Sequence, residues 1–433
     1  MILTNLINST GLAVVDDFSG DFDILFMLLA GILVFFMQAG FTLLESGMTR
    51  SKNSGNIAMK NFMDISVATI TFWAVGYGFV YGGDKILGGF LSNGGIWINE
   101  GLGAHDVFFQ TVFAATAATI VSGAIAGRAK YSTYIIFTVA LTAIIYPISA
   151  GWQWYGDGAF LADLGFIDFA GSSIVHSVGG WAAICAAWMI GPRIGKYNAD
   201  GSVNPIPGGN LLLAALGVFI LWLGWFGFNG GSELAFGGDS SLATAEIIMV
   251  TNIAAAAGAV GALFTSWGYL GKPSLSQTLN GAVAGLVAIT AGCSNFSMAG
   301  GLLAGLIGGI IVVFSIEFIE KTLKIDDAIG AASAHGVVGV WGTLVIGLWG
   351  VADSAGVEKD MSGIGIFNGG GFEQFLVQLA GVGLYAAWAI GTSLLVLYLL
   401  KITIGLRVSE EDEKLGLDES EHGEKAYGSD LTA

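Results

Sequence analysis

Two of the four histidines in this 433-residue chain lie inside long apolar segments, where ionisable side chains are uncommon. His176 stands in SSIVHSVGGWAA and His335 in AASAHGVVGVWG, and both strings fit the pattern H-x-V-x-G. A histidine in a membrane helix is costly unless it faces a cavity or a partner. Neutral imidazole has one donor and one acceptor nitrogen, so two adjacent rings could pass a polar neutral molecule along without a fixed charge. The structural alternative is that each histidine ties two helices together.

Aromatic side chains with nearby polar groups recur in two further segments. In GWFGFNGGS, Trp225, Phe228 and Ser232 follow at spacings of three and four, so they share one helix face. An aromatic ring attracts a cation, and a serine hydroxyl accepts a hydrogen bond from an N–H donor. In FFQTVFAATAATIVSG, Phe109 and Phe113 are one turn apart, and a phenyl ring that closes a pore would exclude water and hydrated ions. Ordinary packing or a lipid-facing stripe is the alternative in both segments.

The segment GWQWYGDGAFLADLGFIDFAGSS, which precedes the first of these histidines, is rich in tryptophan. Trp152 and Trp154 are candidates either for interfacial anchors or for a ring beside a cationic substrate. Asp168 stands just before an apolar helix, so it is a candidate N-cap. Its other candidate role is to shape the negative potential near a cation site.

The composition is typical of a polytopic membrane protein. Hydrophobic residues make up 54% of the chain and charged residues 11%, against about a quarter charged in soluble domains. The 68 glycines suit membrane helices that approach closely, and apolar runs long enough to cross about 30 Å of hydrocarbon recur along the chain. The net charge of −17 comes from acidic loops and an acidic tail, which argues against nucleic acid as a partner. Cys185 and Cys293 are expected to pack, with no disulfide or metal cluster.

Eleven membrane helices are expected, and the positions of Lys and Arg orient them. If the N-terminus lies outside, 14 of the 16 Lys and Arg residues fall in cytoplasmic segments, leaving Lys85 and Lys359 outside. An even number of helices would destroy this separation. The N-terminus lacks a basic region before an apolar stretch, so no cleaved signal peptide is expected. The expected helices are at about 22–48, 62–82, 107–127, 131–150, 170–192, 209–231, 243–270, 276–294, 298–320, 329–350 and 372–402.

The two histidine strings fall in the fifth and tenth of these helices, which suggests an internal repeat. Two copies with an odd number of helices must have opposite orientations, as in inverted-repeat transporters. The polar, acidic C-terminal tail is expected to be cytoplasmic and at least partly mobile. The expected divisions are an outer segment 1–21, a membrane domain 22–402 with repeat A at about 22–192, repeat B at about 209–350 and an extra helix at about 372–402, and a regulatory tail 403–433.

The chain resembles the ammonium transporter (Amt/Rh) family, and its Amt branch in particular. The strings DFAGSSIVH, GWFGFNGGS, GKPSL, ITAGC and AHGVVGVWGTL occur in the family order, followed by GLRVSEEDE, over about residues 22–427. The resemblance implies an all-α integral membrane protein with eleven transmembrane helices, an inverted 5+5 repeat plus one extra helix, and one pore per protomer of a homotrimer. It also implies transport of ammonium or ammonia across the plasma membrane, with methylammonium as a further candidate substrate.

The resemblance assigns roles to individual residues. The implied pore pair is His176 with His335, the implied gate is Phe113 with Phe228, and the implied outer recruitment site is Trp154 with Phe113, Ser232 and, nearby, Asp168. Further pore positions are implied for Trp225, Phe109 and Thr290. Two departures from the family pattern limit the transfer: the loop after Trp152 and Trp154 varies in length, so Trp152 could hold the recruitment position. Ala328 stands where relatives often have proline, so the tenth helix could begin differently.

Regulation and rival functions complete the expectations. Family members respond to a cytoplasmic PII-type regulator, and Ser420 stands where plant relatives have a phosphorylated threonine. A sensor that signals through the tail is a second hypothesis, and a Rhesus-type gas channel is disfavoured by the motif around Trp225. No nucleophile, metal cluster or phosphate-binding loop stands out, so neither an enzyme nor a cofactor is expected. Membrane lipid is an expected partner.

Overall fold

The computed structural model describes the backbone of residues 2–94, 103–351, 353–354, 357–358 and 363–428, and the side chains of residues 20–94, 103–351 and 363–428. Within these ranges, ten helices are long and apolar enough to cross a bilayer, and Leu275–Thr290 is a shorter apolar helix. The expected all-α membrane architecture is thus confirmed. The β-strands of the described residues are two-residue antiparallel pairs in loops: β1 (Lys85–Ile86) with β2 (Leu91–Ser92), and β3 (Asp353–Ser354) with β4 (Val357–Glu358).

Several of the long helices are interrupted by a π-helical turn. In chain order the main helices are α1 (Ile2–Met48), α2 (Ser54–Thr71) continued by η2 (Phe72–Gly76) and α3 (Tyr77–Tyr81), α4 (Ala104–Ala124), α5 (Tyr131–Ala140) continued by η3 (Leu141–Ile145) and α6 (Tyr146–Ala150), η4 (Ser172–Ser177) with α8 (Val178–Ile190), α9 (Leu211–Gly231), α10 (Gly238–Leu270), α11 (Leu275–Thr290), α12 (Met298–Lys321), η5 (Ala332–Val337) with α13 (Val338–Leu344) and α14 (Ile346–Trp349), and α15 (Glu373–Thr403). Shorter helices are η1 (Ser51–Asn53), α7 (Phe160–Asp163), η6 (Ile366–Asn368), α16 (Glu410–Leu415) and α17 (Leu417–His422).

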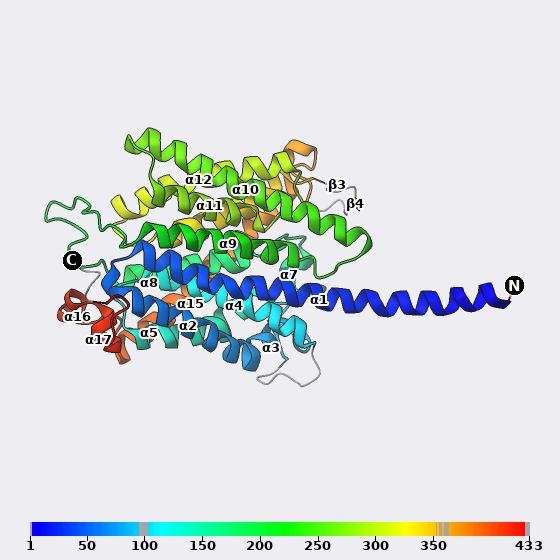
Figure 1. The fold of residues 1–433 in the computed structure, drawn as a ribbon, viewed down its shortest axis with the longest axis horizontal. Coiled ribbons are helices and arrows are strands. Elements are labelled where there is room, and N and C mark those ends of the chain that lie inside the picture. The colour runs from blue at the N-terminus through cyan, green and yellow to red at the C-terminus, as the bar shows by residue number, and fades with distance from the viewer. Residues whose placement is uncertain (1, 95–102, 352, 355–356, 359–362, 429–433) are drawn as a thin grey trace.

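The helices form one bundle with roughly parallel axes, and α1 projects beyond it at its N-terminal end (Figure 1). Helices α1 and α9 lie side by side along the middle of the bundle. Glycines allow their close approach: a Cβ atom on Gly47 would lie 2.4 Å from the backbone nitrogen of Ala214, and one on Gly217 would lie 2.4 Å from that of Leu44. In a membrane the hydrophobic effect does not drive helices together, so close packing at small residues stabilises their contacts instead.

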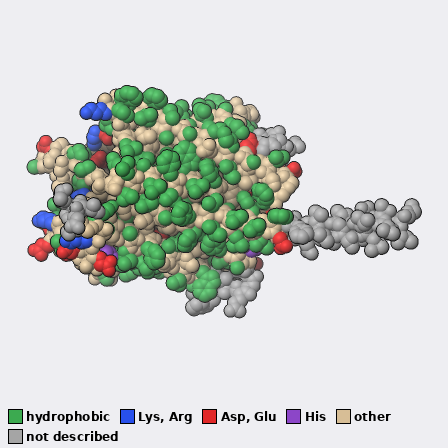
Figure 2. Space-filling view, in the orientation of Figure 1, with side chains coloured by type: hydrophobic (Ala, Val, Ile, Leu, Met, Phe, Trp, Pro, Cys, Tyr) green, Lys and Arg blue, Asp and Glu red, His purple; other side chains and the backbone are tan. Residues whose placement is uncertain are grey.

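Apolar and charged side chains occupy separate regions of the bundle surface, as expected for a protein that spans a membrane. Figure 2 shows hydrophobic side chains over the middle of the face in view, whereas Lys and Arg gather at the end that carries the C-terminal tail. Large apolar side chains such as Phe62, Phe219 and Leu212 are exposed to the extent of 70%, 68% and 80%. Apolar exposure of this kind is stable only against hydrocarbon or another apolar partner.

Helix boundaries differ from the sequence expectation in two places. Helix α2 begins at Ser54 rather than near residue 62, because Asn56, Lys60 and Asn61 in its first turns are buried against neighbouring helices. A hydropathy count treats such residues as loop, since it cannot see their partners. Helix α1 begins at Ile2 rather than near residue 22, so the expected outer segment continues the first helix.

The C-terminal tail is folded where the sequence predicted a polar, partly mobile segment. Helix α17 packs on η1 and the start of α2, and α16 packs on α17 (Figure 1). The buried carboxylate of Glu413 accepts hydrogen bonds from Arg407 Nη2 at 2.7 Å and from the backbone nitrogen of Ile194 at 2.7 Å. Asp418 accepts one from the backbone nitrogen of Asn56 at 2.8 Å. Glu413 and Asp418, which the sequence predicted to be exposed to solvent, therefore bind the tail to the loop at Ile194 and to the start of α2.

Candidate functional site

The two histidines singled out by the sequence meet in the centre of the bundle. His176 lies in η4 and His335 in η5, and their Nδ1 atoms are 3.2 Å apart, with ring centroids 5.2 Å apart. The His176 side chain is fully buried and that of His335 is 4% exposed. The Nε2 atom of His176 is buried and receives no hydrogen bond from any described residue. The pair therefore has the hydrogen-bonded, edge-joined arrangement expected from the repeat.

The short distance between the Nδ1 atoms constrains the protons. One Nδ1 must donate and the other must accept, so two neutral imidazoles in this contact adopt opposite tautomers. One Nε2 then carries a hydrogen while the other presents a lone pair. The pair can thus offer a donor at one ring and an acceptor at the other, and neither ring needs a charge to do so.

Glycines and π-helical turns bring the two histidines together. A Cβ atom on Gly180 would lie 2.2 Å from the backbone nitrogen of Gly336, and one on Gly339 would lie 2.4 Å from the carbonyl oxygen of Ser172. Gly180 and Gly339 are the glycines of the two H-x-V-x-G strings. Each histidine also lies in a π-helical turn, a feature that recurs at functional sites. The motif therefore encodes the close crossing of two helices.

An aspartate precedes each histidine by eight residues and caps its helix. The two carboxylate oxygens of Asp168 accept hydrogen bonds from the backbone nitrogens of residues 171–174 at 2.8–2.9 Å. Asp327 accepts three, from the backbone nitrogens of residues 330–332 at 2.7–3.2 Å. The sequence analysis singled out Asp168 but missed Asp327. The equal spacing to His176 and His335 was the signal that could have found it.

Aromatic rings form a column that leads to the histidine pair. The ring of Phe113 lies 4.1 Å from that of Phe228, measured between centroids, and Phe228 lies 5.3 Å from the ring of His176. Trp225 is stacked on His176 at 4.9 Å. The indole nitrogen of Trp225 donates a hydrogen bond to Thr290 Oγ1 at 2.9 Å, so Thr290 fixes the orientation of the tryptophan.

A cavity of about 360 Å³ lies at the far end of this column, beside the first turns of α4. We call it the Trp154 cavity, and its lining includes Asp106, Phe109, Gln110, Phe113, Trp154, Tyr155 and Ser232. Ser232 Oγ donates to the carbonyl oxygen of Phe228 at 2.8 Å, which leaves its lone pairs free to accept. Phe109 packs on Phe113 with centroids 4.8 Å apart. The cavity thus combines aromatic faces with acceptor oxygens.

Trp154 and Trp152 have separate environments. Trp154 lines the cavity, lies 5.8 Å from Phe113 between ring centroids, and donates its indole hydrogen to the carbonyl oxygen of Asp168 at 2.8 Å. Trp152 is buried elsewhere, among Phe90, Phe160 and other rings. Asp168 therefore acts behind the cavity, by holding Trp154 and the start of the histidine helix.

Asp106 is a cavity residue that the sequence analysis overlooked. It lies in the first turn of α4, where it accepts hydrogen bonds from the hydroxyl of Tyr77 and from Gln110 Nε2, the latter at 3.3 Å. Its carboxylate gives the Trp154 cavity negative potential. Its position one turn before Gln110 and two turns before Phe113 was the available signal.

A second cavity, of about 340 Å³, lies at the opposite end of the bundle. We call it the Asp327 cavity, and its lining includes Lys196, Asn280, Glu320, Asp327, Ala328 and Ile329. Beside it the side chain of Arg193 contacts Asp326 at 2.7 Å. Burial alone would raise the pKa of Asp326, but the hydrogen bonds from Arg193 and the positive charge of Arg128 outweigh it and hold that pKa below its usual value.

Ala328 forms a backbone hydrogen bond just before the tenth helix. Its backbone nitrogen donates a hydrogen bond to the carbonyl oxygen of Ala124 at 3.3 Å. A proline has no hydrogen on nitrogen and could not form this bond. The bond joins the start of the histidine segment to the end of α4.

Ser420, the candidate regulatory residue, lies in α17, far along the chain from either cavity lining. Its hydroxyl oxygen is buried and has no hydrogen-bond partner among the described residues. Among those residues, moreover, no three His, Cys, Asp or Glu side chains gather as a metal site would require.

Known proteins resemble this chain over nearly all of its length. A family model described as Ammonium Transporter Family matches residues 25–427. Ammonium transporter Amt2 of Archaeoglobus fulgidus is 43% identical over 423 residues, which covers 94% of this chain and 88% of that protein. A putative ammonium transporter of Synechocystis is 41% identical and covers 94% of this chain and 89% of its own length.

Two solved structures extend the likeness to the fold. One, named "Sensor Amt Protein", superposes with a TM-score of 0.86 at 39% identity and covers 94% of this chain and 100% of that chain. The crystal structure of Candida albicans Mep2 superposes with a TM-score of 0.81 at 28% identity and covers 90% of this chain and 87% of its own.

Proposed function

Because the chain belongs to the ammonium transporter family, and is therefore an ammonium transporter and not an enzyme, we propose that its substrate crosses the membrane at the His176–His335 pair. One observation carries this proposal. Two buried imidazoles on helices from the two halves of the chain lie with their Nδ1 atoms 3.2 Å apart, beneath a column of aromatic rings. A donor and an acceptor without fixed charge suit a small polar molecule that has left its proton behind.

Transport begins in the Trp154 cavity, which recruits ammonium ion. The indole face of Trp154 and the ring of Phe113 attract the cation, and Ser232 Oγ accepts one of its N–H bonds. The carboxylate of Asp106 adds negative potential at the same place. Methylammonium presents the same cationic N–H donors and is expected to compete for this site.

The stacked rings of Phe113 and Phe228 are the gate. Their centroid separation of 4.1 Å leaves no room for a hydrated ion unless the rings move. A constriction of this kind excludes water, and bare ions pay a large desolvation penalty there. Ammonium transfers its proton at this point, either to water in the Trp154 cavity or to the imidazoles, and ammonia passes along the imidazoles, with Trp225 stacked beside His176.

Selectivity against potassium follows from the same chemistry. Potassium ion is about as large as ammonium, but it has no N–H bonds to donate to Ser232 and no proton to release. It therefore lacks both the recruitment contact and the neutral form that the dry passage accepts. The gate and the histidine pair act together in this discrimination.

The proposed orientation places the Trp154 cavity outside and the Asp327 cavity inside the cell. Supporting it, 14 of the 16 Lys and Arg residues fall on the tail side when the sequence is threaded through eleven helices. The membrane domain at about 22–402 then contains repeat A, repeat B and the extra helix, and the tail is cytoplasmic. The apolar outer faces of α1 and α9 suit contacts between protomers of a homotrimer.

The tail gives this transporter a place for control. A PII-type regulator would act at the Asp327 cavity, and phosphorylation would act at Ser420, whose buried hydroxyl becomes accessible only when α17 leaves its position. A sensor is the second candidate function, favoured by the likeness to a solved relative that is named a sensor, Sensor Amt Protein. A flux measurement separates the two, since a sensor needs binding without turnover.

The test is a current and a flux in liposomes that contain the purified protein. An ammonium concentration jump on a solid-supported membrane, with an equal potassium jump as control, reports charge movement. A pH-sensitive dye trapped inside reports ammonia flux. The expected result is a saturable response to ammonium and none to potassium. Binding of ammonium without either response would favour the sensor and overturn the proposed transport.

A further inference from the structure

A second group of ionisable side chains is buried in the bundle, separate from the histidines. We define the Glu45 cluster as Glu45 of α1, Lys60 and Asn61 of α2, and Ser122 of α4. Each of the four is exposed by 1% or less. Glu45 Oε2 accepts hydrogen bonds from Ser122 Oγ at 2.8 Å and from Asn61 Nδ2 at 3.1 Å. Lys60 Nζ donates to the carbonyl oxygen of Ser122 at 3.1 Å.

Such a cluster is expensive to place in a membrane-spanning segment. A carboxylate or an ammonium group taken from water into an apolar interior loses several kcal/mol of solvation unless it is paired and hydrogen-bonded. Apolar side chains would give equally tight packing without this desolvation penalty. Ionisable residues in membrane helices are therefore functional candidates by default.

The cluster adjoins the pore. Phe41, one turn before Glu45 on α1, lies 6.2 Å from the ring of His335 between centroids. On the other side, Gly123 of α4 separates Glu45 from Ile329, which lines the Asp327 cavity. A Cβ atom on Gly123 would lie 2.3 Å from Ile329 Cδ1 and 3.4 Å from the carboxyl carbon of Glu45. The missing side chain at Gly123 thus leaves Glu45 next to the inner end of the passage.

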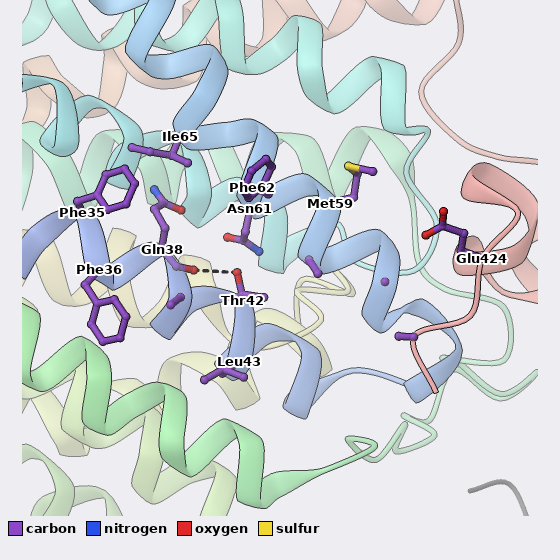
Figure 3. A pocket seen from close by; sticks show the side chains of 14 residues that line it. Phe35, Phe36, Gln38, Thr42, Leu43, Met59, Asn61, Phe62, Ile65 and Glu424 are labelled. Atoms are coloured by element: carbon purple, nitrogen blue, oxygen red, sulfur yellow. Dashed lines mark hydrogen bonds between the residues drawn. The ribbon is translucent and has the colours of Figure 1, made fainter. Parts of the chain in front are cut away.

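The cluster is closed off from lipid on its other side. A groove of about 820 Å³ lies between α1 and α2, and its walls include Phe35, Phe36, Met59 and Phe62 (Figure 3). Gln38, Thr42, Asn61 and Glu424 are the polar and charged residues of its lining. Asn61 turns its amide to Glu45, and Gln38 Nε2 donates to Asp64 at 3.5 Å. The fully buried side chain of Asn61 lies between this groove and Glu45, so we assign proton exchange with Glu45 to the pore side.

We propose that Glu45 is a proton-exchange residue for the substrate at the inner end of the passage. This inference rests on the proposed function. Ammonia that has passed His335 takes the carboxyl proton: the O–H bond of Glu45 breaks, an N–H bond forms, and ammonium leaves through the Asp327 cavity. The remaining carboxylate is held by Ser122 and Asn61 and faces the charge of Lys60. A hydronium ion in the water of the Asp327 cavity returns the proton to Glu45 and becomes a water molecule. Efflux runs through the same steps in reverse.

Other charged groups near the cluster also influence how flux through this site depends on pH. Lys60 of α2 faces Glu45 directly, and Asp64 lies one turn further along the same helix. Asp64 accepts hydrogen bonds from Tyr134 at 2.8 Å and Thr138 at 3.4 Å, away from Gly123. The charge of Arg128 acts on Lys60 from the end of α4. Asp64 is therefore a matched control, being equally buried but remote from the pore.

The test is ammonium flux in liposomes between pH 5 and 9, in water and in deuterium oxide. Glu45→Gln keeps the shape of the side chain and is expected to lower flux at least fivefold, to remove a titration step from the pH profile and to abolish the solvent isotope effect. Glu45→Asp is expected to restore the titration step. Lys60→Met removes the facing cation and is expected to shift the profile upward by about one pH unit. Asp64→Asn removes a negative charge that interacts with Glu45, so it is expected to keep the titration step and the isotope effect and to shift the profile slightly downward.

A further variant tests the route instead of the group. Ile329→Phe enlarges the side chain that packs over Gly123 between Glu45 and the Asp327 cavity, and it is expected to lower flux with Glu45 intact. Gel filtration of each variant in detergent checks assembly. A wild-type pH profile and isotope effect in Glu45→Gln would overturn the inference, as would an equal change in Asp64→Asn. A wild type that moves no ammonium would instead overturn the proposed function.

Discussion

The substitution Asp168→Asn tests how the start of the first histidine helix is held. The Asp168 carboxylate accepts four backbone N–H bonds at 2.8–2.9 Å. An amide replaces one of the two acceptor oxygens with a donor, so two of the four bonds are lost and two N–H groups stay buried without a partner. Hydrogen bonds to a charged group contribute about 1.5–3 kcal/mol each, so the expected cost is about 3–6 kcal/mol.

The assay is thermal unfolding of the purified protein in detergent, followed by tryptophan fluorescence, together with ammonium uptake. Asp168→Asn is expected to melt several degrees lower and to need more ammonium for half-saturation, because Trp154 is bonded to the carbonyl oxygen of residue 168. Asp163→Asn is the control: Asp163 accepts one exposed bond, from Gly158, and a surface change of this kind costs within about 0.5 kcal/mol. Equal melting temperatures for wild type and Asp168→Asn would refute the reasoning.

Three further outcomes are expected. Asp326→Asn breaks a buried ion pair with Arg193 and is expected to lower the free energy of unfolding by about 3–5 kcal/mol at neutral pH. Because the pKa of Asp326 is lowered in the folded protein, the ion pair stabilises the wild type above about pH 4, and this stabilisation is lost as pH falls below that value. The melting temperatures of the two proteins should therefore converge in a series of increasingly acidic buffers. Trp154→Leu removes a cation–π contact of about 0.5–2 kcal/mol, so half-saturation of uptake should rise about 2- to 30-fold, whereas Trp152→Leu should leave it unchanged. Ser420→Asp places a charge in a buried position and should expose the tail to protease; a protected tail would contradict the docking described for α17.

The overall fold and the histidine pair could be predicted from the sequence. Long apolar segments identify membrane helices by length alone, and the odd helix number followed from the distribution of Lys and Arg. The juxtaposition of His176 and His335 followed from a shared pattern in helices five and ten. It is confirmed by the 3.2 Å contact between the rings. Periodic and repeated patterns of this kind can be recognised in the sequence without knowing which residues pack against them.

Features that depend on partners could not be predicted. The early start of α2 was missed because Lys60 and Asn61 look like loop residues until Glu45 and Ser122 are placed beside them. The π-helical turns that carry the histidines have no sequence periodicity of their own. The tail looked free because one of its anchors, the backbone nitrogen of Ile194 that donates to Glu413, comes from a distant loop.

Potassium exclusion in His335→Ala is the most direct test of the central claim, that a neutral imidazole pair conducts the substrate. Currents are measured after matched ammonium and potassium jumps on solid-supported membranes with wild type and with the variant. The variant is expected to lose discrimination between ammonium and potassium and to show a potassium current that the wild type lacks. An ammonium current of full size that stays blind to potassium in His335→Ala would contradict it.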